Sequence, residues 1–89
     1  MTRLPLGAVY ATPGALHLLD RARVSATTLL ARHAGGDWGD IPPEDAAENR
    51  LSIAQGFRVL SSYPMADDRI WIITEADRTS TTLLLPSEY

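Results

Sequence analysis

The spacing of hydrophobic positions changes from helical to strand-like at about Gly56. Before that point apolar residues recur every three or four positions, which is the period of an amphipathic helix. The three apolar faces predicted in this way are Leu16/Leu19/Ala22, Leu29/Leu30/Ala34 and Ala47/Leu51/Ala54. After Gly56, apolar and polar residues alternate from Phe57 to Tyr63, which is typical of a strand.

Capping residues predict where the helices begin and end. Thr12 is a good N-cap, and Pro13 suits the first helical position because proline lacks the amide that would be unpaired there. The other predicted boundaries are Ser25 as the N-cap of a helix over 26–33, Gly35-Gly36 as its end, Pro42-Pro43 as an entry and Gly56 as a stop.

Strands are predicted before the first helix, over 6–11, and after the last one. Residues 70–73 form a nearly continuous β-favouring run, so this strand should be central, covered on both faces, with Trp71 in the core. Residues 64–68 are predicted to be a loop. The last strand, over 81–85, would be an exposed edge that is able to pair across a dimer.

The order β-α-α-α-β-β-β predicts one α+β domain over residues 1–89. The expected architecture is a mainly antiparallel sheet of three or four strands with two or three helices on one face. No stretch is long and apolar enough to span a membrane, and no signal-peptide h-region stands at the N-terminus. The expectation is therefore a soluble cytoplasmic protein.

Composition excludes several chemistries. The chain has no cysteine, so disulfides, thiolate metal sites and cysteine nucleophiles are excluded. All eight cations are arginine, which removes Schiff-base and P-loop lysine chemistry. A net charge of −3 argues against a general nucleic-acid binder, which normally carries a basic face.

The negative charge is concentrated in one segment. Residues 1–33 hold four arginines and one aspartate, residues 34–49 hold five acids and no cation, and residues 50–89 hold four arginines and five acids. The acidic segment opens with a Gly- and Pro-rich loop that contains a tryptophan, and exposed loop residues often serve function. The candidate partner-binding residues are Asp37, Trp38, Asp40, Glu44, Asp45 and Glu48.

Trp38 has two interpretations. It folds back as a lid on the core, with its indole N–H bonded to a loop carbonyl, or it stands exposed as an interface anchor. The lid is favoured because tryptophan is highly buried on average. The acids likewise form either a solvated helix N-terminus or a surface complementary to a basic partner.

Other constellations give weaker signals. His33 with Asp37 and Asp40 has the donor types of a metal site, but the spacing matches no known ligand motif. We expect His33 instead to carry partial charge at a helix C-terminus. An ion pair within 75–78 would hold a hairpin turn. No nucleophile is paired with a base, and no catalytic residue, metal or cofactor is predicted.

Several residue groups resemble small plasmid-related and integrative-element proteins of proteobacteria. They are Ala11-Thr12-Pro13-Gly14-Ala15-Leu16, Ala31-Arg32-His33, Gly36-Asp37-Trp38-Gly39-Asp40, Gly56-Phe57-Arg58, Trp71-Ile72-Ile73-Thr74-Glu75-Ala76-Asp77-Arg78 and Leu85-Pro86-Ser87-Glu88-Tyr89. The resemblance implies a setting, mobile DNA, in which small acidic proteins often bind host or defence machinery. It implies no established activity and no catalytic residues.

Two functions follow as hypotheses. The first is a non-enzymatic inhibitor or modulator that binds a host or defence-system protein, such as a CRISPR or restriction complex, through its acidic loop and helix. The alternative is a small dimeric DNA-binding regulator of transcription or plasmid maintenance, with a helix-turn-helix-like pair of helices. Its basic face would consist of Arg3, Arg21, Arg23 and Arg32.

Overall fold

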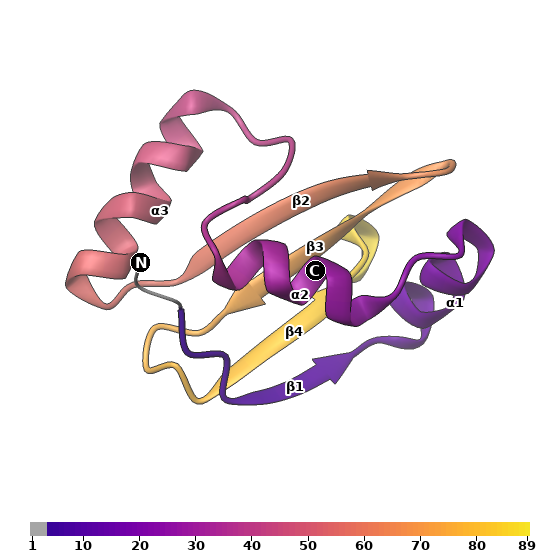
Figure 1. Ribbon diagram of the computed structural model, residues 1–89, viewed down its shortest axis with the longest axis horizontal. Coiled ribbons are helices and arrows are strands. Elements are labelled where there is room, and N and C mark those ends of the chain that lie inside the picture. Colours follow the sequence, from indigo (N-terminus) through magenta and orange to yellow (C-terminus); the bar gives the residue numbers. More distant parts are fainter. Residues whose placement is uncertain (1–3) are drawn as a thin grey trace.

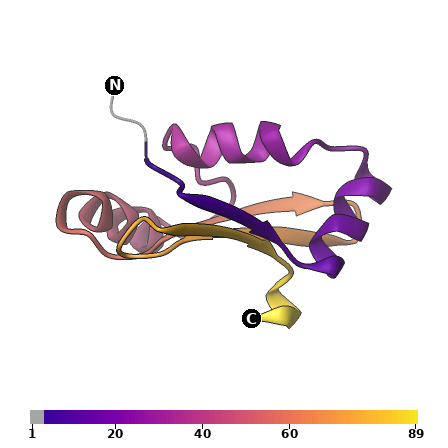
Figure 2. The same ribbon diagram turned by 90° about the horizontal axis from the view of Figure 1, so that it is seen from below.

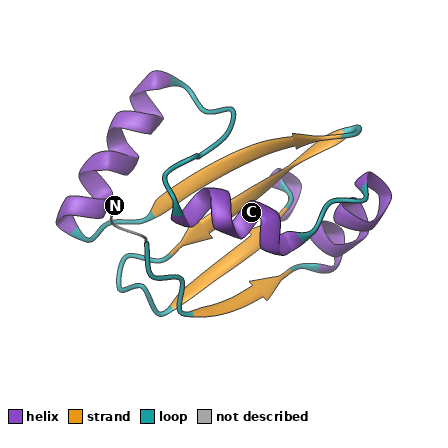
Figure 3. Cartoon of the chain, in the orientation of Figure 1, coloured by secondary structure: helices purple, strands orange, loops and turns teal. Residues whose placement is uncertain are grey.

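Three helices and a four-stranded sheet account for most of residues 4–89, the part of the chain that this computed structural model describes. The elements are β1 (Ala8–Ala11), α1 (Pro13–Ala22), α2 (Ala26–Ala34), α3 (Pro43–Gln55), β2 (Val59–Met65), β3 (Asp68–Thr74), β4 (Ser80–Leu84) and the 3-10 turn η1 (Pro86–Glu88) (Figure 1). The strand order is β1-β4-β3-β2 (Figure 3). Strand β1 runs parallel to β4, and the other neighbours are antiparallel. The predicted α+β class and element order are confirmed.

The predicted helix boundaries are confirmed by their caps. The Thr12 side chain accepts a hydrogen bond from the Ala15 amide, and the Ser25 side chain accepts one from the Thr27 amide. Gly56 ends α3 in the left-handed conformation, at φ 78°, which a residue without Cβ adopts at low cost. None of the helices in residues 4–89 is long and apolar enough to cross a membrane.

The core lies between the sheet and the first two helices. Its buried cluster combines helix residues with inward-facing strand residues: Ala15, Leu18, Leu19, Leu29, Tyr63, Ile70, Ile72 and Leu83. Each large side chain buried in this way contributes about 2 kcal/mol of transfer free energy. Leu16, predicted to face the core, is 54% exposed. The buried face of α1 instead runs through Ala15 and Leu18, one step around the helix.

The predicted apolar face of α3 is wrong. Ala47, Leu51 and Ala54 are exposed, whereas Asn49 and Ser52 are buried. The physical reason is the position of the helix, which lies beside the edge of β2 (Figure 1). A strand edge presents unpaired N–H and C=O groups. A helix that covers the edge therefore needs hydrogen-bonding side chains on the face that meets it.

The hairpin of β2 and β3 is longer than predicted. The expected loop over 64–68 shrinks to a tight turn, because Pro64 and Met65 belong to β2 and Asp68 opens β3. Proline is tolerated in β2 because this strand is at the edge of the sheet, where a missing N–H breaks no ladder bond.

The second sheet face is only partly covered. Trp71 was predicted to be core, but it is half-buried on the face opposite Ile70 and Ile72, where it packs edge-on against Tyr89 at 5.7 Å between ring centroids. Figure 2 shows η1 on the opposite side of the sheet from α2. The Glu88 carboxylate fixes η1 by accepting hydrogen bonds from the Thr12 hydroxyl and from the Gly14 amide of α1. The 3-10 turn is thereby bonded to the start of α1.

The expected open edge is also corrected. Strand β4 lies inside the sheet, between β1 and β3, so the strand that ends near Leu85 is not an edge. The edges are β1 and β2, and β2 is covered by the segments described below.

Candidate functional site

The acidic segment begins with a loop whose first carboxylate is engaged within the protein. The Asp37 carboxylate accepts hydrogen bonds from Arg32 Nε at 2.7 Å and from the Gly39 amide at 3.3 Å. The Arg32 guanidinium lowers the pKa of Asp37, and it also stacks 4.5 Å from the centre of the Tyr63 ring. Asp37 therefore has a structural role in this loop.

The same loop covers the outer edge of β2. The Ser62 amide donates to the Trp38 carbonyl at 3.0 Å, and the Asp40 amide donates to the Ser62 carbonyl at 2.7 Å. Gly39 lies between these bonds in a parallel bridge to Ser62, at φ 74°. The Asp40 carboxylate lies 3.7 Å from the Arg69 guanidinium. The loop thus pairs like a short strand.

Trp38 fits neither of its two interpretations completely. The side chain is half-buried, and its indole nitrogen is buried without a hydrogen-bond partner among the described residues. The lid interpretation predicted a bond from this N–H to a loop carbonyl, and the structure has none within residues 4–89. A fully exposed anchor is excluded as well.

Asn49 completes the cover of the β2 edge. Its amide group donates to the Leu60 carbonyl at 2.7 Å and accepts from the Leu60 amide at 3.1 Å, so the side chain imitates a neighbouring strand. Leu60, Ser62 and Pro64 alternate along this edge. The backbone of Leu60 is bonded to Asn49, and that of Ser62 is bonded to the loop. Pro64 has no N–H to offer. The edge is closed to further strands.

We expect Asn49→Ala to lower the free energy of unfolding by about 2 kcal/mol. Two hydrogen bonds are lost, and the Leu60 N–H and C=O groups are left without partners beneath α3. Urea unfolding measures the loss, and hydrogen exchange locates it at the Leu60 amide. The Ser62 amide, held by Trp38, serves as the internal control. Unchanged protection at Leu60 would contradict the role of Asn49.

The remaining acids belong to α3 and differ from those of the loop. Glu44, Asp45 and Glu48 are exposed, and none of them forms an ion pair with a residue within 4–89. Of the candidate binding residues, the loop acids are thus used internally, whereas the helix acids are available to a partner.

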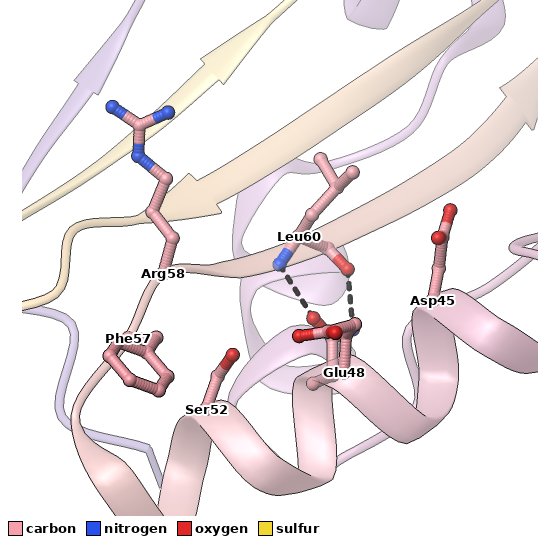
Figure 4. A pocket seen from close by; sticks show the side chains of 7 residues that line it. Asp45, Glu48, Ser52, Phe57, Arg58 and Leu60 are labelled. Atoms are coloured by element: carbon pink, nitrogen blue, oxygen red, sulfur yellow. Dashed lines mark hydrogen bonds between the residues drawn. The ribbon is translucent and has the colours of Figure 1, made fainter.

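Two adjoining hollows lie beside these helix acids. The first, of about 320 Å³, lies between α3 and β2 (Figure 4). Its lining is Asp45, Glu48, Asn49, Ser52, Phe57, Arg58 and Leu60. The second, of about 220 Å³, is lined by Arg58, Leu60, Trp71, Ile73 and Tyr89. Arg58 and Leu60 line both hollows, so the two are neighbours. We refer to them together as the groove, with the acids of α3 at one end and Trp71 at the other.

Arg58 lies in the middle of this groove with its charge balanced. Its Nε lies 3.1 Å from the Glu75 carboxylate, and its Nη1 donates to the Tyr89 hydroxyl at 2.9 Å. The predicted ion pair within the 75–78 turn is therefore wrong. The Arg78 guanidinium donates instead to the Ser52, Phe57 and Glu75 carbonyls, which fixes the C-terminal end of α3.

His33 is buried in a chain of hydroxyl groups. Its Nδ1 lies 2.5 Å from Ser61 Oγ, its Nε2 lies 2.9 Å from Thr74 Oγ1, and Thr74 in turn lies 2.7 Å from Thr81. The Thr81 hydroxyl donates to the Leu6 carbonyl, so each hydroxyl upstream donates to the next group. This direction assigns the proton of a neutral ring to Nε2.

The expectation that His33 carries charge at a helix end is wrong. Burial lowers the pKa of His33 to about 4, so the ring is neutral at pH 7. Both ring nitrogens are occupied by hydroxyl partners, and within residues 4–89 no three His, Cys, Asp or Glu side chains are grouped as metal ligands. Ser61 and His33 are fully buried and line neither hollow of the groove, so this pair acts in the core.

The arginines of the DNA-binding alternative are partly engaged. Arg21 pairs with Asp67 at 3.3 Å and Arg32 with Asp37, whereas Arg23 is exposed. Arg3 lies outside the described residues. No observation in the described part of the chain favours this alternative over the first hypothesis.

Sequence reasoning missed the apolar part of the groove. The alternation along β2 placed Arg58 and Leu60 on one face, but nothing in the sequence brought that face beside α3 and Tyr89. Comparison with known proteins adds no assignment: no protein-family model, curated protein or solved structure matches the chain. The suggested plasmid-related family stays a prediction.

Proposed function

We propose that this chain is a non-enzymatic protein-binding modulator that attaches to a basic surface of a host or defence-system protein. The observation that carries the proposal is the surface of α3, where Glu44, Asp45 and Glu48 are exposed and form no ion pair with another described residue. Clustered charge of one sign speeds and orients encounter with a surface of the opposite sign. The groove next to these acids adds apolar surface that a partner is able to bury, which strengthens binding beyond what charge provides.

The resemblance to mobile-element proteins suggests the class of target. A CRISPR or restriction complex in the cytoplasm carries basic surfaces that bind nucleic acid, and an acidic protein is able to compete for them. In this proposal the helix acids make the charge contacts. Asp37 and Asp40 hold the loop, and half-buried Trp38 supplies the apolar contact of that loop.

The test is affinity capture from host lysate with the tagged protein and with the triple variant Glu44→Gln/Asp45→Asn/Glu48→Gln. We expect a partner that is retained by the wild type and released by the triple variant, with affinity reduced by at least about tenfold, since three rim charges are removed. Quantitative mass spectrometry identifies the partner, and calorimetry with that partner measures the change.

A second triple variant controls for total charge. Asp20→Asn/Asp67→Asn/Asp68→Asn makes the same change in net charge at exposed positions away from α3; two of them lie at the β2–β3 turn, at the other end of the sheet (Figure 1). It should retain the partner. Equal loss in both variants would mean that net charge alone is responsible. An empty capture would turn attention to the DNA-binding alternative, which fluorescence anisotropy with duplex DNA at low salt tests.

A further inference from the structure

We infer that the groove between α3 and η1 binds an extended segment of the partner in which a lysine or arginine stands two positions from a large apolar residue. This inference rests on the proposed function and specifies what the same face recognises. The groove has an acidic end and an apolar end, and each end accepts a different side chain.

The acidic end suits a long cationic side chain. Asp45 and Glu48 line the first hollow from α3, Leu60 lies opposite Glu48, and Phe57 lies at the end near Arg58 (Figure 4). Lysine and arginine combine an aliphatic stem with a charged head, so the stem would lie on Phe57 and Leu60 while the head meets the carboxylates. An acidic segment would be repelled.

The apolar end suits an aromatic or large aliphatic side chain. The second hollow is bounded by Trp71, Ile73 and Tyr89, and Trp71 is a half-buried aromatic on the sheet face that η1 covers in part. Arg58 lies between the two ends, and its ion pair with Glu75 reduces its repulsion of a cation bound at Asp45. Apolar burial here adds affinity that the exposed acids alone would not provide.

The spacing of the pattern follows from the geometry of an extended chain. Alternate residues of such a chain point to the same side, about 7 Å apart, so they are the pair of side chains able to enter two neighbouring hollows at once. A basic residue, any residue and then a large apolar residue is therefore the expected pattern, in either direction along the segment.

A displayed library of random linear peptides, selected on the immobilised protein, tests the inference without knowledge of the partner. We expect enrichment of the basic–any–apolar pattern. A selected peptide should bind Asp45→Asn/Glu48→Gln about tenfold more weakly than wild type, since two charges at the first hollow are removed. The matched control is Glu44→Gln, an acid of the same helix that does not line the groove, and it should bind normally.

Nuclear magnetic resonance places the bound peptide. The indole N–H signal of Trp71 should shift on titration, whereas that of Trp38 should not. Selection of peptides without the pattern, or binding that is unaffected by the Asp45/Glu48 variant, would overturn the inference. If a captured partner still depends on the helix acids in that case, the proposed function stands and only the peptide pattern fails. If patterned peptides bind but the triple variant retains its partner, the proposed function fails instead.

Discussion

His33→Ala is expected to lower the free energy of unfolding by about 4 kcal/mol, a large part of the roughly 5–15 kcal/mol that stabilises a domain. The substitution leaves a cavity at a fully buried position, and it leaves the Ser61 and Thr74 hydroxyls without the ring that each contacts. Loss of an inner member of a buried hydrogen-bond chain costs more than loss of a surface bond, because buried polar groups on both sides are left unpaired. Urea unfolding at pH 7, followed by circular dichroism, measures the change, with His17→Ala at an exposed position as control.

The pH dependence of this effect separates the ring from the rest of the core. The folded-state pKa of His33 is about 4 and the unfolded value is about 6.5, so below pH 6.5 only the unfolded chain gains the proton. The contribution of His33 to stability is complete above pH 6.5 and falls by about 3 kcal/mol as the pH drops to 4. His33→Gln keeps one acceptor and one donor but does not titrate. Its stability deficit relative to wild type should therefore shrink across this window, and a constant deficit would contradict the buried neutral ring.

Much of the fold could be predicted from sequence because local signals are strong at element ends. Thr12 and Ser25 as caps and Gly56 as a stop need only neighbouring residues to act, and they lie where expected. The alternation after Gly56 likewise predicted strands, since a half-buried strand imposes a period of two. These signals do not depend on how the elements pack.

The errors concern elements whose environment is set by distant residues. α3 was assigned a buried apolar face because Leu51 and its neighbours have helical spacing, but the helix covers a strand edge and buries Asn49. Periodicity shows which residues share a face and not what that face meets. For the same reason, the candidate binding residues fall into two groups, the loop acids used within the protein and the exposed acids of α3. Asp37 and Glu48 look alike in sequence. In the structure Arg32 binds the Asp37 carboxylate and the Tyr63 hydroxyl donates to the Asp37 backbone carbonyl, so Asp37 has a structural role.

The loop at 36–40 provides a matched pair of glycines that separates backbone strain from close contact. Both Gly36 and Gly39 have positive φ, at 92° and 74°. A Cβ on Gly36 meets no atom within 4 Å, whereas a Cβ on Gly39 would overlap the Ser62 carbonyl oxygen and the Tyr63 ring. Strain alone costs about 1 kcal/mol in either position.

Gly39→Ala should therefore lower the free energy of unfolding by about 3 kcal/mol, and Gly36→Ala by about 1 kcal/mol. The additional loss comes from the two bonds of Ser62 to the loop, which must break or lengthen when the chains move apart. Hydrogen exchange at the Ser62 amide should accelerate in Gly39→Ala only. Because the outer edge of β2 is then exposed, this variant should also aggregate more readily at high concentration. Equal destabilisation of the two variants, with Ser62 still protected, would mean that the loop does not close the sheet edge.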